Sequence, residues 1–258
     1  METKNNNIKS VSKAIKIIEV IVKHNHGISL SQLANELGMA RSTVHGLVST
    51  LLDNGYVAQD NNTGYYELGN KLYEVGNAVA NKWTEKKIAR EYINYLGEKF
   101  KETVHMSKLS EGQVLYIDKY ESTQSIRIET EIGVLLPAYC TGVGKVLMAY
   151  LSLNEVQFIM KKHPLIKYTD NTITNLDKLR SELNKIKEHG YAIDNQEYMI
   201  GLYCIAVPIF NHHNEVIAAL SISAHISRIN EQYTNKIINE LLKVSKEISL
   251  KLGSTYYE

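Results

Sequence analysis

Residues 29–68 read SLSQLANELGMARSTVHGLVSTLLDNGYVAQDNNTGYYEL, and this stretch decides the fold of the N-terminal part of the chain. Its pattern predicts a short helix, a tight turn, a second helix and a β-hairpin, in that order. This order is typical of a winged helix-turn-helix, in which the second helix fits the major groove of DNA. The stretch therefore predicts a DNA-reading domain in a chain whose overall composition suggests none.

The ends of these elements are marked by their residue types. Ser29 and Gln32 have capping-box spacing, and Gly38 is the residue that a helix C-terminus prefers. The second helix is expected over about residues 40–54, and strands are expected over 56–60 and 65–68. The apolar stripe of the second helix consists of Val44, Leu47, Val48, Leu51 and Leu52.

Small or hydrogen-bonding side chains occupy the opposite face of the second helix, where they can reach base edges and phosphates. Over residues 1–70 the basic residues are balanced by an equal number of acidic ones, so the prediction depends on pattern and not on charge. Helix packing without a DNA role is the alternative. The candidate DNA-contacting residues are Ser31, Arg41, Ser42, Thr43, His45, Ser49 and Asn62.

The whole chain has the composition of an ordinary folded protein. Its 258 residues predict about two domains, and a net charge of +1 with 22% charged residues argues against disorder or a membrane-surface protein. No segment resembles a signal peptide or a membrane span. Two widely separated cysteines, Cys140 and Cys204, fit a reducing compartment, and we expect a cytoplasmic protein with no metal site and no cofactor.

Three parts are expected along the chain: a winged helix-turn-helix domain at 1–70, a linker helix at 71–85, and a second domain at 86–258. In the second domain the patterns predict helices flanking an antiparallel sheet, which is an α+β fold. The expected strands are 104–109, 114–120, 125–130, 191–195, 203–210 and 216–223. The expected helices include 154–161, 176–189 and 232–252.

Two patterns in the second domain favour a small-molecule cavity. Gly142 and Gly144 lie at the entry to a helix, where free backbone N–H groups attract an anion, although such glycines also serve close packing. One face of a strand carries Ala219, Ser221 and Ser223, and the preceding strand carries Leu202, Cys204 and Ala206. Small, partly polar side chains at these positions predict either a ligand cavity or a closely packed helix.

Candidate catalytic groups are weak by comparison. Asp194 and Glu197 are expected in a loop, where solvation is the usual state of an acid. His105, Cys140 and Cys204 lack the short spacing of metal ligands, and a single histidine on a strand is more often structural. We therefore expect no catalytic residue.

Several motifs in order resemble the IclR family of bacterial transcription regulators over about residues 11–253. They are ISLSQLANELGMARSTVHGLVSTLLDNGYV, TGYYELGNKLYEVG, ETVHMSKLSEGQVLYIDK, LPAYCTGVGKVLMAYL, YTDNTIT, GYAIDNQEYMIGLYCIAVPIF and VIAALSIS. The resemblance implies a winged helix-turn-helix joined by a linker helix to a GAF-like effector-binding domain. It also implies dimers, often paired into tetramers, that bind a palindromic operator near a catabolic or stress gene.

The same resemblance implies that the effector is a small organic acid or an aromatic compound. The effector-binding positions that it transfers to this chain are Ser125, Gly142, Val143, Asp194, Leu202, Cys204, Ser221 and Ser223. The chain departs from the family pattern at Gly46 and Tyr203, where the family usually has arginine.

From these observations we expect a ligand-responsive transcription regulator, a repressor, whose partners are double-stranded operator DNA, a small-molecule effector and further copies of the chain. One alternative is a ligand-independent DNA-binding protein whose second domain only oligomerises. Another is an enzyme that uses Cys204 or Cys140 with His105.

Overall fold

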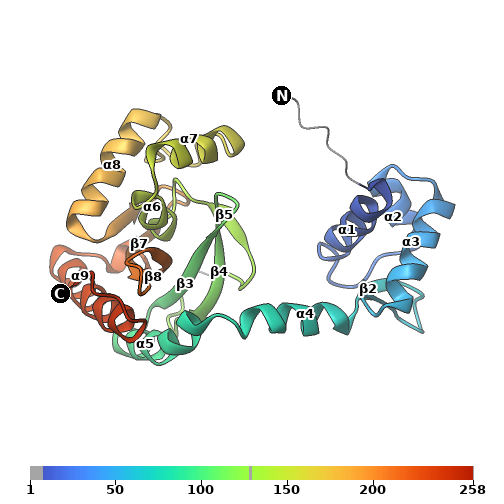
Figure 1. Ribbon diagram of the computed structural model, residues 1–258, viewed down its shortest axis with the longest axis horizontal. Coiled ribbons are helices and arrows are strands. Elements are labelled where there is room, and N and C mark those ends of the chain that lie inside the picture. The colour runs from blue at the N-terminus through green and yellow to red at the C-terminus, as the bar shows by residue number, and fades with distance from the viewer. Residues whose placement is uncertain (1–7, 128–129, 258) are drawn as a thin grey trace. The chain divides into compact units, whose positions relative to one another are not determined.

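The structure is a computed structural model that describes residues 8–127 and 130–257. The chain divides into two compact units, Met1–Trp83 and Thr84–Glu258 (Figure 1). None of the helices in the described ranges has the length and apolar character needed to cross a membrane.

The first unit has the predicted order of elements. Three helices come first, then a two-stranded antiparallel sheet and a last helix. They are α1 (Lys9–Ile21), α2 (Leu30–Leu37), α3 (Arg41–Asp53), β1 (Val57–Gln59), β2 (Tyr66–Leu68) and α4 (Asn70–Ala80). Apolar side chains from all of these elements except α4 form one core, which includes Ile17, Leu33, Val44, Val48, Val57 and Tyr66.

The helix-end signals of the sequence are confirmed in this unit. The Ser29 hydroxyl accepts a hydrogen bond from the Gln32 backbone N–H at 3.3 Å, and the Gln32 side chain accepts one from the Ser29 N–H at 3.1 Å. Gly38 ends α2 in the left-handed conformation, with φ of 60°. These contacts fix the turn that separates α2 from α3.

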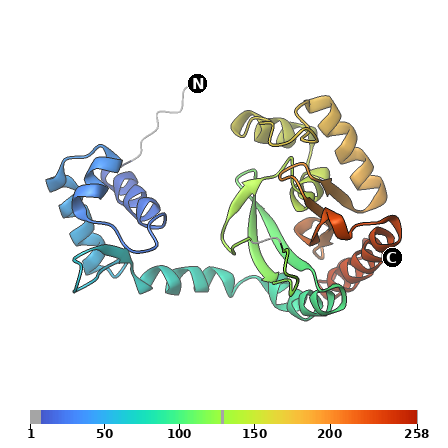
Figure 2. The same ribbon diagram turned by 180° about the vertical axis from the view of Figure 1, so that it is seen from behind.

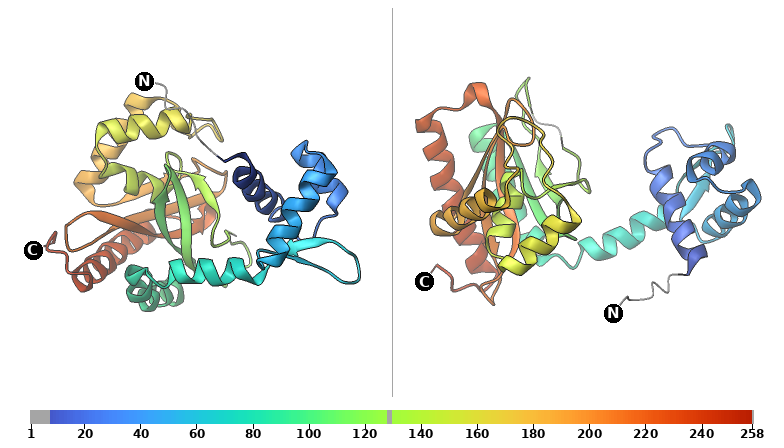
Figure 3. Two further views of the ribbon diagram at one scale, coloured as in Figure 1. Left: turned by 45° about the vertical axis from the view of Figure 1, so that its right-hand side comes forward. Right: turned by 90° about the horizontal axis from the view of Figure 1, so that it is seen from above.

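The second unit is built on an antiparallel sheet, in which the described residues form six strands in the order β5-β4-β3-β8-β7-β6. The two longer helices, α5 and α9, cover one face, and α6, α7 and α8 cover the other (Figures 1 and 3). The view from behind shows the same layers (Figure 2). The strands are β3 (Thr103–Ser110), β4 (Gln113–Tyr120), β5 (Leu135–Pro137), β6 (Ala192–Asn195), β7 (Leu202–Phe210) and β8 (Val216–His225). The helices are α5 (Thr84–Phe100), α6 (Gly142–Ala149), α7 (Leu153–Lys162), α8 (Leu176–His189), the short η1 (Ile226–Arg228) and α9 (Glu231–Lys251).

Strand register gathers the predicted small residues on one face. Cys204 pairs with Asp194 on β6 and with Ser223 on β8. Ser221 pairs with Ala206 on β7 and with His105 on β3. Because directly opposed residues point to the same side of a sheet, and so do residues two apart along a strand, these side chains share one face.

One predicted strand is wrong. Residues 125–127 and 130 belong to no strand, and Ile126 is exposed; residues 128 and 129 of the expected strand lie outside the described residues. The edge of β4 pairs instead with β5, in the register Gln113↔Pro137. The alternation of SIRIET is typical of a strand, but a strand also needs a free sheet edge, and β5 occupies that edge.

Candidate functional site

The exposed face of α3 is the first candidate site. Arg41, Ser42, Thr43, His45 and Ser49 are all exposed, whereas Val44 and Val48 of the same helix are buried in the core. The structure thus brings five of the predicted DNA-contacting residues onto one outward helix surface.

The other two predicted DNA-contacting residues lie on separate elements. Ser31 is exposed in the first turn of α2, and Asn62 is exposed in the turn between β1 and β2. Asp60 shapes that turn by accepting hydrogen bonds from the backbone N–H groups of Asn62 (3.0 Å) and Thr63 (2.7 Å). These bonds hold the pKa of Asp60 below its usual range, and the bond from Thr63 has the largest effect.

A groove with three lysines lies beside the start of α3. Lys9, Lys13 and Lys16 line it from α1, together with residues 37–40 and Thr43. Ala40 precedes α3, and no described side chain caps the helix, so its first backbone N–H groups are left for an anion next to the three lysines. Counting charges over the whole segment missed this cluster, although the 9, 13, 16 spacing already places the three lysines on one helix face.

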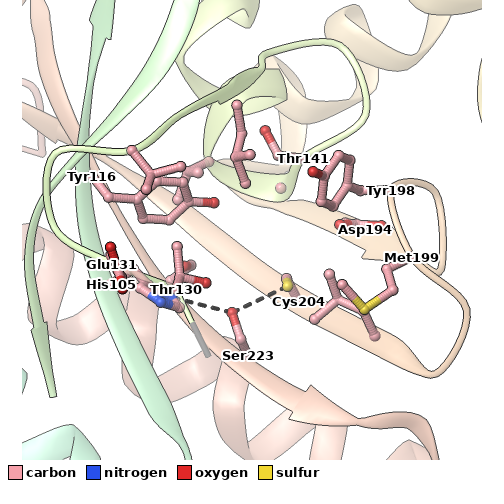
Figure 4. A pocket seen from close by; sticks show the side chains of 16 residues that line it. His105, Tyr116, Thr130, Glu131, Thr141, Asp194, Tyr198, Met199, Cys204 and Ser223 are labelled. Atoms are coloured by element: carbon pink, nitrogen blue, oxygen red, sulfur yellow. Dashed lines mark hydrogen bonds between the residues drawn. The ribbon is translucent and has the colours of Figure 1, made fainter. Parts of the chain in front are cut away.

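A cavity of about 300 Å³ in the second unit is the second candidate site (Figure 4). Of the predicted effector-binding residues, Gly142, Val143, Asp194, Leu202, Cys204, Ser221 and Ser223 line it. Ser125 is not among the lining residues and is exposed instead. The lining residues that the sequence did not single out as effector contacts are His105, Tyr116, Thr130, Glu131, Val134, Leu136, Thr141, Tyr198 and Met199.

A chain of hydrogen bonds runs along the sheet side of the cavity. The Cys204 thiol donates to Ser223 Oγ at 3.1 Å, and Ser223 Oγ lies 3.4 Å from His105 Nδ1 (Figure 4). Burial, and to a smaller extent the charge of Lys119, lowers the pKa of His105 to about 3, so the ring is neutral. With Ser223 donating to Nδ1, the proton of the ring lies on Nε2, which has no partner within the described chain.

The two cysteines are unsuited to nucleophilic chemistry. Burial raises the pKa of Cys204 well above its usual value, and burial also raises the pKa of Cys140. Because the thiolate is the nucleophile, both side chains remain inert thiols near neutral pH. This disfavours the enzyme alternative on physical grounds.

Asp194 and Glu197 are not solvated loop acids, so this expectation is wrong. Asp194 lies in β6 with no exposed surface, and Glu197 follows it and is also buried. Asp194 Oδ1 accepts a hydrogen bond from the Glu197 N–H at 2.8 Å, while Oδ2 has no partner among the described residues. Burial raises the pKa of Asp194 to about 7. The sequence hid this because α6, which packs against β6 and binds Ile193 O through Lys145, is remote along the chain.

Glu197 is held by a buried lysine on α6. Lys145 Nζ forms an ion pair with Glu197 and also donates to Ile193 O at 2.6 Å and to Glu182 at 3.3 Å. The Lys145 side chain is 1% exposed. A charge buried to this extent is tolerated because every donor has an acceptor.

The start of α6 forms another wall of the cavity. The Thr141 hydroxyl donates to Pro137 O at 3.0 Å, so within the described structure no side chain caps α6. A Cβ on Gly144 would lie 2.2 Å from Ala138 O, so this glycine permits close packing, as the alternative interpretation held. Gly142 and Val143 line the cavity. Among the described lining residues there are two carboxylates, Asp194 and Glu131, and no lysine or arginine.

Comparisons with known proteins agree with both units. Residues 10–61 match the IclR helix-turn-helix domain, and residues 78–250 match the bacterial transcriptional regulator IclR C-terminal domain. The transcriptional repressor IclR of Escherichia coli K12 is 31% identical over 248 residues, which cover 95% of this chain and 90% of that protein. The regulator KdgR of the same organism is 33% identical over 246 residues, which cover 95% of this chain and 94% of that protein.

The crystal structure of the Thermotoga maritima IclR has a TM-score of 0.79 at 33% identity, and the match covers 96% of this chain and 100% of that one. The match confirms the predicted architecture, a helix-turn-helix domain followed by an α+β domain. The matched proteins are transcriptional regulators, which confirms a DNA-binding regulator and not an enzyme. The chain belongs to the IclR family of transcriptional regulators.

Proposed function

We propose that this protein is a repressor that binds operator DNA through the first unit and is controlled by a small effector in the cavity of the second. The observation that carries the proposal is the cavity itself, whose wall includes two buried polar atoms without a partner among the described residues, His105 Nε2 and Asp194 Oδ2. A buried polar atom without a partner is costly in a folded protein. A ligand that supplies the missing hydrogen bonds removes this cost.

The DNA contacts are divided between bases and phosphates. Arg41, Ser42, Thr43, His45 and Ser49 face the major groove from α3, and Ser31 and Asn62 contact the backbone on either side. Support comes from their exposure, because none of them is needed in the core. The lysine groove adds phosphate contacts from Lys9, Lys13 and Lys16.

The repressor works as a dimer or a tetramer. Helix α4 buries none of its own side chains within the described chain, and the exposed fractions of Tyr73, Val75 and Val79 are 76%, 45% and 49%. Val11 and Ile15 of α1 are exposed as well. Exposed apolar side chains of this density favour association with a second copy. A dimer would hold two α3 helices about 34 Å apart, one DNA turn, for a palindromic operator.

The effector is a small organic acid or an aromatic compound. The cavity combines apolar walls, such as Val134, Leu136 and Leu202, with a few polar groups, which is the composition of a small-molecule site.

Relatives that are 31% identical include proteins named the acetate operon repressor and the transcriptional repressor IclR. Their names support the repressor role.

Control requires that the effector bind the DNA-competent and DNA-incompetent states with different affinity. Such coupling is typically about 1–3 kcal/mol, which changes operator affinity by roughly 5–150-fold. A compound that binds both states equally shifts nothing, however tightly it binds.

The test combines ligand binding and DNA binding in the full-length protein. The operator is first selected from a random duplex library, and small carboxylates and aromatics are then screened by their effect on the melting temperature. We expect His45→Ala to weaken operator binding while the ligand-induced melting shift persists. We expect Ser221→Leu, which fills the cavity, to abolish that shift while the ligand-free protein keeps its operator affinity.

The outcome separates the proposal from its alternatives. Equal loss of both activities in His45→Ala would contradict the assignment of the two sites. If compounds shift the melting temperature but leave operator affinity unchanged, the protein is a ligand-independent DNA-binding oligomer and the effector proposal fails.

A further inference from the structure

Asp194 is placed to decide the charge of the effector. Its Oδ1 atom is used by the Glu197 N–H, while Oδ2 is buried, without a partner in the described chain, and belongs to the cavity wall. Figure 4 shows Asp194 on the same side of the cavity as Thr141, the residue before α6. A carboxyl group and an uncapped helix start therefore border one end of the space.

These two groups make opposite demands on a ligand. The free N–H groups of a helix start favour a negative group. An ionised Asp194 repels such a group, because the carboxylate is buried and a like charge close to a buried charge interacts with it strongly. The conflict disappears if Asp194 is a neutral carboxylic acid, since its O–H then donates a hydrogen bond to the same negative group.

We infer that the cavity binds the anionic group of its effector together with one proton, which Asp194 carries on Oδ2 and donates to the ligand. This inference rests on the proposed effector role of the cavity. Binding is coupled to the uptake of one proton: the ligand enters as a carboxylate anion, Asp194 takes one proton from solvent, and no bond of the ligand is broken.

Within the described part of the cavity wall, no cation replaces the proton. The charge of Lys145 on α6 acts to lower the pKa of Asp194, but Lys145 already binds Glu197, Glu182 and Ile193 O. None of the described lining residues is a lysine or an arginine. The positive charge next to Asp194 is therefore neutralised before a ligand arrives.

The other titratable groups around Asp194 do not take up the proton. Burial raises the pKa of Cys204 on β7, Cys140 before α6, Tyr116 on β4 and Tyr198, all of which stay neutral near pH 7. His105 on β3 is neutral because burial lowers its pKa. Burial raises the pKa of Glu197 as well, but the ion pair with Lys145 opposes that rise; Glu182 on α8 reaches the same lysine, and Glu131 is exposed. The pKa of Asp194 is raised by burial to about 7, which leaves it as the group that gains the proton.

The pH dependence follows from this assignment. Well below pH 7 the free protein already holds the proton, so carboxylate affinity does not change with pH. Well above pH 7 each further unit weakens binding about tenfold, because the proton must be taken up from a more dilute source.

The experiment uses the full-length protein and matched pairs of probes, namely benzoate with benzyl alcohol and pyruvate with hydroxyacetone. Melting shifts are measured between about pH 6 and pH 8.5 for the natural protein and for Asp194→Asn. The asparagine keeps the shape and always presents an N–H donor. Asp170→Asn is the matched control, because Asp170 is an exposed carboxylate paired with Lys167 and is not a lining residue.

We expect carboxylates to bind better than their alcohols, and to bind about fivefold more weakly at pH 8 than at pH 7 in the natural protein and in Asp170→Asn, because about half of the Asp194 groups are already ionised at pH 7. In Asp194→Asn the affinity should lose its pH dependence. Calorimetry at about pH 8 in phosphate and in Tris should show uptake of nearly one proton by the natural protein, which decides the matter even if Asp194→Asn does not fold.

Binding of the alcohols alone, or carboxylate binding without proton uptake, would overturn the inference and leave the cavity as an effector site. If none of these probes shifts the melting temperature but compounds of the wider screen do, the inference is overturned while the effector role stands; if no compound of that screen does, the effector role fails and the inference with it.

Discussion

Helices α3 and α6 both begin without a side-chain cap from the described residues, but in opposite surroundings. Ala40 precedes α3, whose first residues are exposed; Thr141 precedes α6, whose residues are all buried. By contrast, Ser152, Asn175 and Asn230 cap α7, α8 and α9. An uncapped start leaves donors for a partner. In water many anions can reach those donors, so side chains must select the partner. Where the helix start is buried, the charge of the neighbouring groups selects it.

The largest effect on stability is expected from removing the buried cation of α6, Lys145. Lys145→Met leaves Glu197 buried without its partner, and we expect a loss of about 3–5 kcal/mol in the free energy of unfolding. Urea denaturation measures it. Lys162→Met is the control: it breaks an exposed ion pair with Glu111 and should cost at most about 1 kcal/mol. Similar losses in the two variants would show that burial of Lys145 carries no special weight.

A second prediction concerns the pH dependence of stability. The pKa of Asp194 is raised from 3.8 to about 7 in the folded chain, so between these values the folded state keeps a proton that the unfolded state has lost. This group therefore lowers the free energy of unfolding by about 1.4 kcal/mol per pH unit as the pH rises towards 7, and contributes no slope above it. Urea denaturation at several pH values should show this slope reduced in Asp194→Asn. An unchanged slope would contradict the assignment.

At the start of α3 the effect should be smaller and should depend on salt. Replacing Lys9, Lys13 or Lys16 by alanine should reduce the slope of log affinity against log salt by about 1 for each lysine removed, equally for all operator sequences. Fluorescence anisotropy at several salt concentrations measures the slope. Lys23→Ala, outside the groove, is expected to leave it unchanged. Equal reductions in the four variants would mean that the groove has no special role.

The smallest effect is expected at Gly46 in the middle of α3. No described atom outside the helix lies within 4 Å of a Cβ placed there, so Gly46→Ala should stabilise the first unit by up to about 1 kcal/mol through helix propensity. Thermal melting measures the gain. Gly144→Ala in α6 should do the opposite, because its Cβ would meet Ala138 O at 2.2 Å. A loss of stability in Gly46→Ala would contradict the open surroundings of α3.

Local patterns predicted most of the fold. The capping box at Ser29, the helical stripe of α3 and the alternation on β7 and β8 each depend on residues close together in sequence, and the structure has all three. The strand expected at residues 125–130 is wrong because occupation of a sheet edge is a property of the whole sheet.

Only part of the cavity was predicted, because some of its residues follow a local pattern and others depend on distant elements. Ser221, Ser223 and Cys204 were found because missing volume on a strand face is visible in the sequence. His105 was taken as structural, and Asp194 as solvated, because their burial arises from packing against elements that are distant along the chain, namely β8 beside His105 and α6 beside β6. The residues that set the charge of the cavity were thus the hardest to recognise.

The exposed face of α3 has a consequence for how this protein diverges in evolution. Ser42, His45 and Gly46 contribute nothing to the core, and substitutions at such surface positions typically change stability by no more than about 0.5 kcal/mol. Asp194, Cys204 and Ser223 stand in register on adjacent strands, so a new side chain at one of them disturbs the others. With the two sites assigned as proposed, single mutations on α3 would redirect the protein to new genes, whereas a new chemical signal would require several coordinated changes.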